Sequence, residues 1–69
     1  MTLSEFNQFK NEINKYIGKE ITYTCYIPSA DRDKVTRGTV DGISEDGDCV
    51  VIAFWGTRNL IHYTKILNY

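Results

Sequence analysis

Residues 49–55 have the sequence CVVIAFW, the longest apolar run in the chain, and this stretch decides the fold. If it forms a β-strand, its side chains alternate between two faces of the sheet. One face would then carry Val50, Ile52 and Phe54, and the other Cys49, Val51, Ala53 and Trp55. Both faces are apolar, whereas a strand with one wet face alternates apolar with polar residues. We therefore expect both faces to be covered, one of them by the interior of the sheet.

An amphipathic helix predicted over about residues 3–17 is the first candidate to cover the second face of the strand 49–55. Thr2 and Glu5 have the spacing of a capping box, in which each side chain satisfies a free backbone N–H of the first turn. Gly18 suits the left-handed conformation just past a helix end. A dimer partner is the competing cover, and we favour the helix because it belongs to the same chain. The apolar residues of this helix recur at helical spacing: Leu3, Phe6, Phe9, Ile13, Tyr16 and Ile17.

The rest of the chain, about residues 20–67, has the pattern of β-strands. Residues 20–27 alternate and are rich in Ile, Thr and Tyr, and Pro28 ends this strand. Further strands are predicted at about 35–43, 49–55, 60–63 and 64–67, with turns or loops at 29–34, 44–48 and 56–59. A chain of 69 residues forms one domain. We therefore predict a single domain over 1–69 that is mainly β, with one N-terminal α-helix.

The strand pattern is similar to a known class of small barrels. Residues 38–43 (GTVDGI), an acidic turn ending in Gly47, residues 50–54 (VVIAF) and residues 65–67 (KIL) resemble the core of SH3-like small barrels. Tudor, chromo-like and KOW-type domains share this core. The resemblance covers about residues 20–67. It implies a five-stranded antiparallel, strongly bent barrel that binds peptides, methylated side chains or nucleic acids and very rarely catalyses a reaction.

The aromatic cage of Tudor domains is not carried over to this chain. Such a cage needs three or four aromatic side chains that converge on a cation. Tyr23, Tyr26, Trp55 and Tyr63 are of the right type, but their spacing does not match that family closely.

Charge and composition narrow the classes of function. The formal net charge of −1 provides no strongly basic field for non-specific DNA binding. No apolar run approaches the length of a membrane span, and residues 1–5 lack the pattern of a signal peptide. We therefore expect a cytoplasmic protein in which Cys25 and Cys49 are buried, reduced thiols, in preference to a disulfide between them. The many residues with AT-rich codons point to a low-GC bacterium or a bacteriophage.

Catalytic and metal-binding constellations each lack a necessary member. His62 is the only histidine, and a catalytic base needs a nucleophile and an orienting carboxylate nearby. Two cysteines and one histidine without paired spacing do not predict a zinc site. The segment 45–48 (EDGD) lacks the regular spacing of a calcium loop and suits a hairpin turn instead. We therefore expect no enzyme activity, no metal and no cofactor.

Two groups of residues are candidates for binding. The first combines Trp55, Arg58, His62 and Tyr63 around the turn at Gly56, and Trp, Tyr and Arg are enriched in interface hot spots. The competing interpretation, which we narrowly favour, places Trp55 in the core beneath the helix and Arg58 in solvent. The second group surrounds the polar loop 29–34 and consists of Tyr26, Arg32, Lys34 and Arg37. A solvated polar loop is the commoner outcome there.

The sequence thus predicts a binding module and leaves its partner open. The first hypothesis is a protein–protein interaction module, a small regulator or inhibitor from a phage or mobile element, either monomer or homodimer. The alternative is a nucleic-acid-binding small barrel that stacks bases on aromatic side chains and holds phosphates with basic ones. The basic residues that motivate this alternative are Arg32, Lys34, Arg37 and Arg58. No interaction with a membrane is expected.

Overall fold

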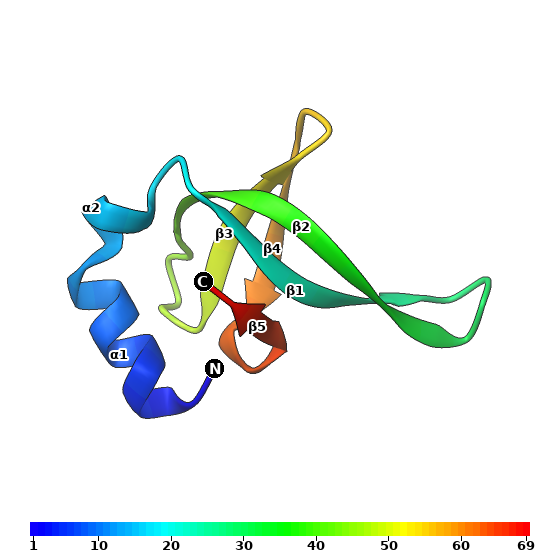
Figure 1. Cartoon of the computed structure of the whole chain (residues 1–69), viewed down its shortest axis with the longest axis horizontal. Helices are drawn as coiled ribbons and strands as arrows, with labels where there is room; N and C mark the ends of the chain where they lie inside the picture. Colours follow the sequence, from blue (N-terminus) through cyan, green and yellow to red (C-terminus); the bar gives the residue numbers. More distant parts are fainter.

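A computed structural model describes all residues, 1–69, and confirms a mainly β chain with an N-terminal helix (Figure 1). The elements are α1 (Leu3–Asn11), α2 (Ile13–Tyr16), β1 (Glu20–Ile27), β2 (Arg32–Ile43), β3 (Cys49–Phe54), β4 (Thr57–His62), the 3₁₀ turn η1 (Tyr63–Lys65) and β5 (Ile66–Asn68). All strand pairs are antiparallel, and the order across the sheet is β4-β3-β2-β1-β5.

The five strands form one open sheet rather than a closed barrel. β4 is one edge of this sheet and β5 is the other, and no ladder joins them. β5 has three residues and pairs only with Thr22 and Tyr23, so the second half of β1 has a neighbour on one side only. The predicted antiparallel sheet is therefore present, and the barrel closure is not.

The first hairpin is longer than the sequence pattern predicted. Residues 32–34, which we expected in a polar loop, continue β2, because Arg32, Asp33 and Lys34 pair with Ile27, Tyr26 and Cys25. The turn is correspondingly short, and Asp31 adopts a left-handed conformation there with φ of 48°. Asp tolerates this conformation better than most residues. The β1–β2 hairpin projects to the right in Figure 1, away from the two helices.

The predicted N-terminal cap is confirmed, but the single helix over 3–17 is wrong. Thr2 Oγ1 accepts from the Glu5 N–H at 3.2 Å, and Glu5 Oε1 accepts from the Thr2 N–H at 2.8 Å, which completes the capping box. The helix breaks at Glu12, whose φ of −109° and ψ of 21° lie outside the helical range. After the break, Ile13 and Tyr16 pack against the core.

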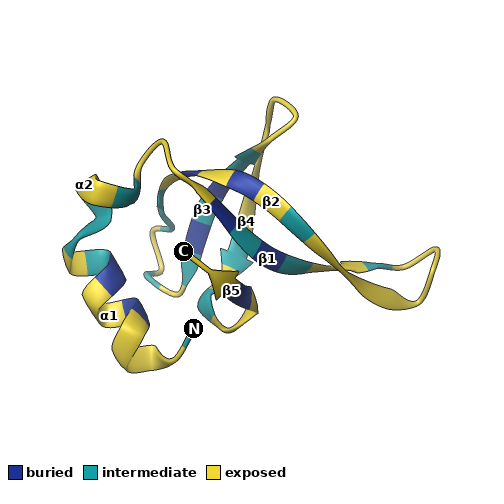
Figure 2. Ribbon diagram, viewed as in Figure 1, coloured by how far each residue is buried: buried dark blue, intermediate teal, exposed yellow.

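The core lies between the helix and the inner face of the sheet (Figure 2). Val50 and Ile52 are fully buried there, as the alternation predicted. The helix packs on this same face, so the prediction that it covers the outer face of β3 is wrong. The outer face of β3 is only half-buried. The buried hydrophobic residues are Phe6, Phe9, Ile21, Tyr23, Val40, Val50, Ile52 and Ile66.

We expect Thr2→Ala to lower the free energy of unfolding by about 1 kcal/mol, because one free N–H of the first helical turn loses its acceptor. The urea midpoint of unfolding, followed by circular dichroism, measures this change. Thr2→Ser keeps the hydroxyl and should be close to neutral. An equal loss in both variants would show that the cap does not stabilise the fold.

Candidate binding cleft

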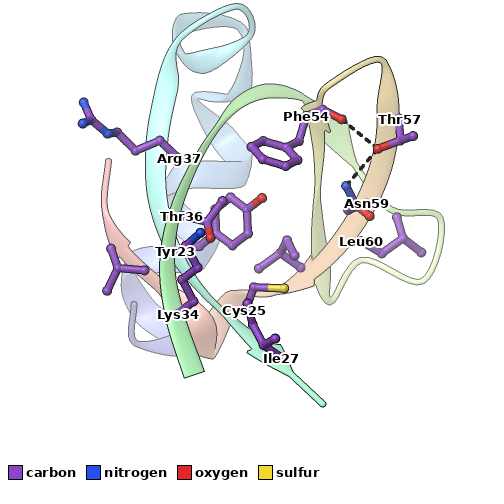
Figure 3. Close-up of a pocket in the computed structure, with 12 residues that line it drawn as sticks. Tyr23, Cys25, Ile27, Lys34, Thr36, Arg37, Phe54, Thr57, Asn59 and Leu60 are labelled. Atoms are coloured by element: carbon purple, nitrogen blue, oxygen red, sulfur yellow. Dashed lines mark hydrogen bonds between the residues drawn. The ribbon is translucent and has the colours of Figure 1, made fainter. Parts of the chain in front are cut away.

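The largest hollow of the molecule lies on the inner side of the sheet, beyond the core. We call it the hairpin cleft, because the β1–β2 and β3–β4 hairpins form its two walls (Figure 3). Its volume is about 780 Å³, which is within the usual range for small-ligand sites. The cleft is lined by Tyr23, Cys25, Ile27, Lys34, Val35, Thr36, Arg37, Phe54, Thr57, Asn59, Leu60 and Ile61.

The cleft exists because the helices cover only one part of the inner face. Phe6 and Phe9 of α1 fill the space over Ile21 and Val40, whereas no residue from 24 to 37 is buried. Since the sheet does not close, the walls of the two hairpins stand apart there. A face that would be interior in a closed barrel is therefore open to solvent.

Tyr23 lies at the boundary between the core and the cleft. The residue is 3% exposed, yet its hydroxyl makes no hydrogen bond within the protein. No buried side-chain oxygen is shut away without a partner, so this hydroxyl reaches the cleft. Figure 3 shows it pointing toward the space between the walls. Burial raises the pKa of Tyr23, so the hydroxyl stays protonated at neutral pH and can donate a hydrogen bond.

Further polar groups share the face of Tyr23. Thr36 pairs with Tyr23, and Lys34 pairs with Cys25, so these side chains project to the same side of the β1–β2 ladder. Lys34 forms no salt bridge. On the opposite wall, Asn59 contributes an amide whose only side-chain hydrogen bond is a long one, 3.5 Å, to Thr57 Oγ1.

The opposite wall also supplies an apolar surface. Phe54 of β3 and Ile61 of β4 line this wall of the cleft, and Ile27 of β1 lines the wall that faces them. Thr57 Oγ1 donates to the Phe54 carbonyl at 2.7 Å, which holds the β3–β4 turn in place beside the Phe54 ring (Figure 3). The cleft thus combines an apolar wall with several unpaired polar groups, a combination typical of ligand-binding sites.

Trp55 lies at the tip of the β3–β4 turn and is not in the core. It is 87% exposed, so the interpretation that places it beneath the helix is wrong. Trp55 and Gly56 both have positive φ, 51° and 78°, as a type I′ turn requires. A bulky side chain rarely adopts this conformation, and such strain is often found at functional sites. The Trp55 ring contacts the Phe54 ring edge-on, with 6.0 Å between the centroids.

We expect Trp55→Asn to raise the free energy of unfolding by about 0.5–1 kcal/mol, because Asn-Gly is the preferred pair for this turn and little buried contact is lost. Chemical denaturation measures the gain. Trp55→Val removes the same ring but introduces a β-branched residue at positive φ, and should destabilise the fold. Equal effects of the two substitutions would contradict the role of backbone strain.

The structure separates the other residues of the first predicted group. Arg58 Nε lies 2.9 Å from Asp41 Oδ2. His62, at the other end of β4, caps η1: its Nδ1 accepts from the Thr64 N–H at 3.3 Å. Tyr63 is half-buried and stacks on Phe6 with 4.9 Å between the ring centroids. Trp55 and Arg58 thus lie at one end of the strand, and His62 and Tyr63 at the other.

The second predicted group lies along the β1–β2 hairpin. Tyr26 is exposed and donates a hydrogen bond to Asp31. Arg37 contacts Glu20 at 3.5 Å. Arg32 and Lys34 form no salt bridge, and of these residues only Lys34 and Arg37 line the cleft.

Most of the residues that line the cleft were not among the binding residues predicted from the sequence. Phe54, Asn59 and Ile61 were not proposed as binding residues, although Phe54, Thr57 and Asn59 lie on one face by the register of β3 and β4. The prediction of two buried thiols is wrong: Cys25 is exposed and lines the cleft, and Cys49 is half-buried. Both cysteines are free. No three side chains of His, Cys, Asp or Glu gather in an arrangement that could hold a metal ion.

Comparisons of this chain with protein-family models, with curated proteins and with solved structures found no significant match. None of its helices has the length and apolar character needed to cross a membrane.

Proposed function

We propose that this chain is a small non-enzymatic module that binds a partner protein through the hairpin cleft and the apolar side chains beside it. The observation that carries this proposal is the part of the inner face that the helices leave uncovered, a concave and largely apolar cleft with a volume of about 780 Å³. A concave site with an apolar lining and a few polar groups is the usual form of a recognition site.

Exposed apolar residues near the cleft extend this surface. Trp55, Phe54 and Leu60 come from the β3–β4 hairpin, and Val35 from the β1–β2 hairpin. Exposed apolar side chains are unremarkable when scattered singly, but several of them at the walls of one cleft favour an interaction site. Trp is also one of the residue types enriched in interface hot spots.

A nucleic-acid-binding module is the second candidate. The exposed rings of Trp55 and Tyr26 could stack on bases, and Arg32 and Lys34 are free to contact phosphates. The pairing of Arg37 with Glu20 and of Arg58 with Asp41 weakens this candidate, because both cations are already partly neutralised. A protein partner therefore remains the first proposal.

The finer class of fold is part of the same proposal. The strand order and the bent, antiparallel meander support an opened relative of the SH3-like small barrels. A role as a regulator or inhibitor from a phage or mobile element fits the small size and near-neutral charge. The exposed free thiol of Cys25 is typical of a reducing compartment such as the cytoplasm.

Affinity capture with an epitope-tagged chain tests the proposed function. We expect the unmodified chain to retain one protein reproducibly after nuclease treatment, and Trp55→Asn to lose it. Leu67→Asn is the matched control, because Leu67 is an exposed apolar residue, 54% accessible, on β5 and outside the cleft. Capture that depends on Trp55 and not on Leu67 supports the proposal. Capture of nucleic acid alone, or of nothing that depends on Trp55, contradicts it.

A further inference from the structure

We propose that the hairpin cleft recognises a carboxylate side chain that stands beside a bulky apolar one in an extended segment of the partner. This inference rests on the proposed function and deepens it, because it names the chemistry of the partner. Three features of the cleft carry it: a positive charge without an acidic partner, a hydroxyl that makes no hydrogen bond within the protein, and an apolar wall.

The charge of the cleft is opposite in sign to that of the chain. Its lining contains Lys34 and Arg37 and no Asp or Glu, although the whole chain has a net charge of −1. Arg37 contacts Glu20 and points away from the cleft in Figure 3, whereas Lys34 has no acidic partner. Asp33, the residue before Lys34, projects to the other face of β2, because neighbouring side chains of a strand alternate. The cleft therefore attracts a negatively charged group.

The Tyr23 hydroxyl is the second feature. It belongs to a residue that is 3% exposed, it has no acceptor in the protein, and it points into the cleft. Because this hydroxyl is accessible from the cleft and has no partner within the protein, it is free to donate a hydrogen bond to a ligand that accepts one. The Lys34 ammonium can only donate hydrogen bonds, so it also needs an acceptor. Among acceptors, a carboxylate is favoured, because a charge-assisted hydrogen bond is stronger than a neutral one.

The apolar wall is the third feature and requires more than a simple anion. Phe54 faces the polar groups of β1 and β2 across the cleft in Figure 3, and Ile61 also lines the cleft. In an extended peptide, residues two apart project to the same side. A segment with Glu or Asp two positions from an aromatic or branched residue could therefore place one side chain near Lys34 and the other against Phe54.

Fluorescence anisotropy with two labelled peptides tests the inference. The probes are Ser-Phe-Ser-Glu-Ser-Phe-Ser with blocked termini and the same peptide with Gln in place of Glu. We expect the Glu peptide to bind about tenfold more tightly than the Gln peptide, because a hydrogen bond to a charged group contributes about that factor. Amide shifts of residues in β1 and β4 should map the contact to the cleft.

Conservative variants link the preference to the proposed residues. Tyr23→Phe removes only a hydroxyl that bonds nothing in the protein, and Lys34→Gln removes only a charge, so both should fold. Each should reduce the tenfold preference to less than about threefold. Tyr16→Phe and Lys65→Gln are matched controls outside the cleft and should retain the full preference.

Other outcomes overturn the inference. Equal binding of the Glu and Gln peptides, or no binding of either at millimolar concentration, would exclude carboxylate recognition by this cleft. Free 3-phenylpropionate that binds as tightly as the Glu peptide would show that a small acid, not a protein segment, is the ligand. In each case the Trp55-dependent capture of a partner still decides the proposed function separately, since that experiment uses neither peptide.

Discussion

Phe6→Ala is expected to leave the chain largely unfolded at 37 °C. The Phe6 side chain is fully buried and stacks on the rings of Phe9 and Tyr63, with centroids 6.4 and 4.9 Å away. Removal of a buried Phe side chain costs about 3–5 kcal/mol. A single core in a chain below about 70–80 residues rarely supplies more than about 3–5 kcal/mol of stability, so the loss takes most of it. No second helix of comparable length replaces the lost contact with the sheet.

Thermal unfolding followed by circular dichroism measures this effect. We expect the midpoint to fall by at least about 12 °C. Leu3→Ala is the matched control, because Leu3 lies in the same helix but is 57% exposed. A similar midpoint for both variants would show that α1 does not anchor the core.

Gly38→Ala should lower the free energy of unfolding by about 1–3 kcal/mol through overpacking. A Cβ at Gly38 would lie 2.3 Å from Ile52 Cγ2 and 3.2 Å from the Ala53 carbonyl oxygen. Ile52 is fully buried and, as a β-branched residue, has little freedom to rotate away. β2 and β3 would have to separate near Tyr23, whose Cε1 lies 3.4 Å from the same Cβ.

A second glycine of the same strand provides the control. Nothing lies within 4 Å of a Cβ built on Gly42, and its φ is not positive, so Gly42→Ala should be neutral or slightly stabilising. Denaturant titration of both variants and of Gly38→Ala/Ile52→Ala tests the mechanism. The double variant should lose less than the sum of the two single losses. Strict additivity would exclude the contact with Ile52 as the cause.

The faces of the strands could be predicted from the sequence, because side-chain alternation is a local property. Ile21 and Tyr23 share the inner face with Val50 and Ile52, as their spacing indicates. The capping box at Thr2 was equally predictable, since it depends on two residues three positions apart.

The segments that pack on each face of the sheet could not be predicted, because this packing depends on contacts between residues far apart in the sequence. The apolar residues Val51 and Ala53 suggested a second covered face, yet their side is only half-buried. Ala53 lies between Thr39 and Arg58 in the ladders, and the Arg58 stem and its ion pair with Asp41 provide partial shielding instead of a helix. The apolar composition of residues 49–55 thus predicted a strand, but it did not predict which elements pack on the two faces of that strand.

The residues of the cleft could not be predicted for the same reason, because they come from distant segments of the chain. Lys34 was proposed as a binding residue by its charge, and Tyr23 was considered only as a cage aromatic. Their proximity to Phe54 and Asn59 follows from an open sheet, whereas the barrel pattern predicted a closed one. Trp55 was misplaced for a related reason: it continues an apolar run, but the positive φ values at 55 and 56 end the strand before it.

The β1–β2 hairpin has a consequence for motion on slow timescales. None of its residues from 24 to 37 is buried, so its outer ladder is held by backbone hydrogen bonds and a few exposed side-chain contacts. Segments of this kind open locally without global unfolding. Amides of the hairpin should therefore exchange with deuterium faster than those of Val50 and Ile52. Because the hairpin is one wall of the cleft, its local opening changes the width of the cleft. A ligand that contacts both walls should slow the exchange of the hairpin amides.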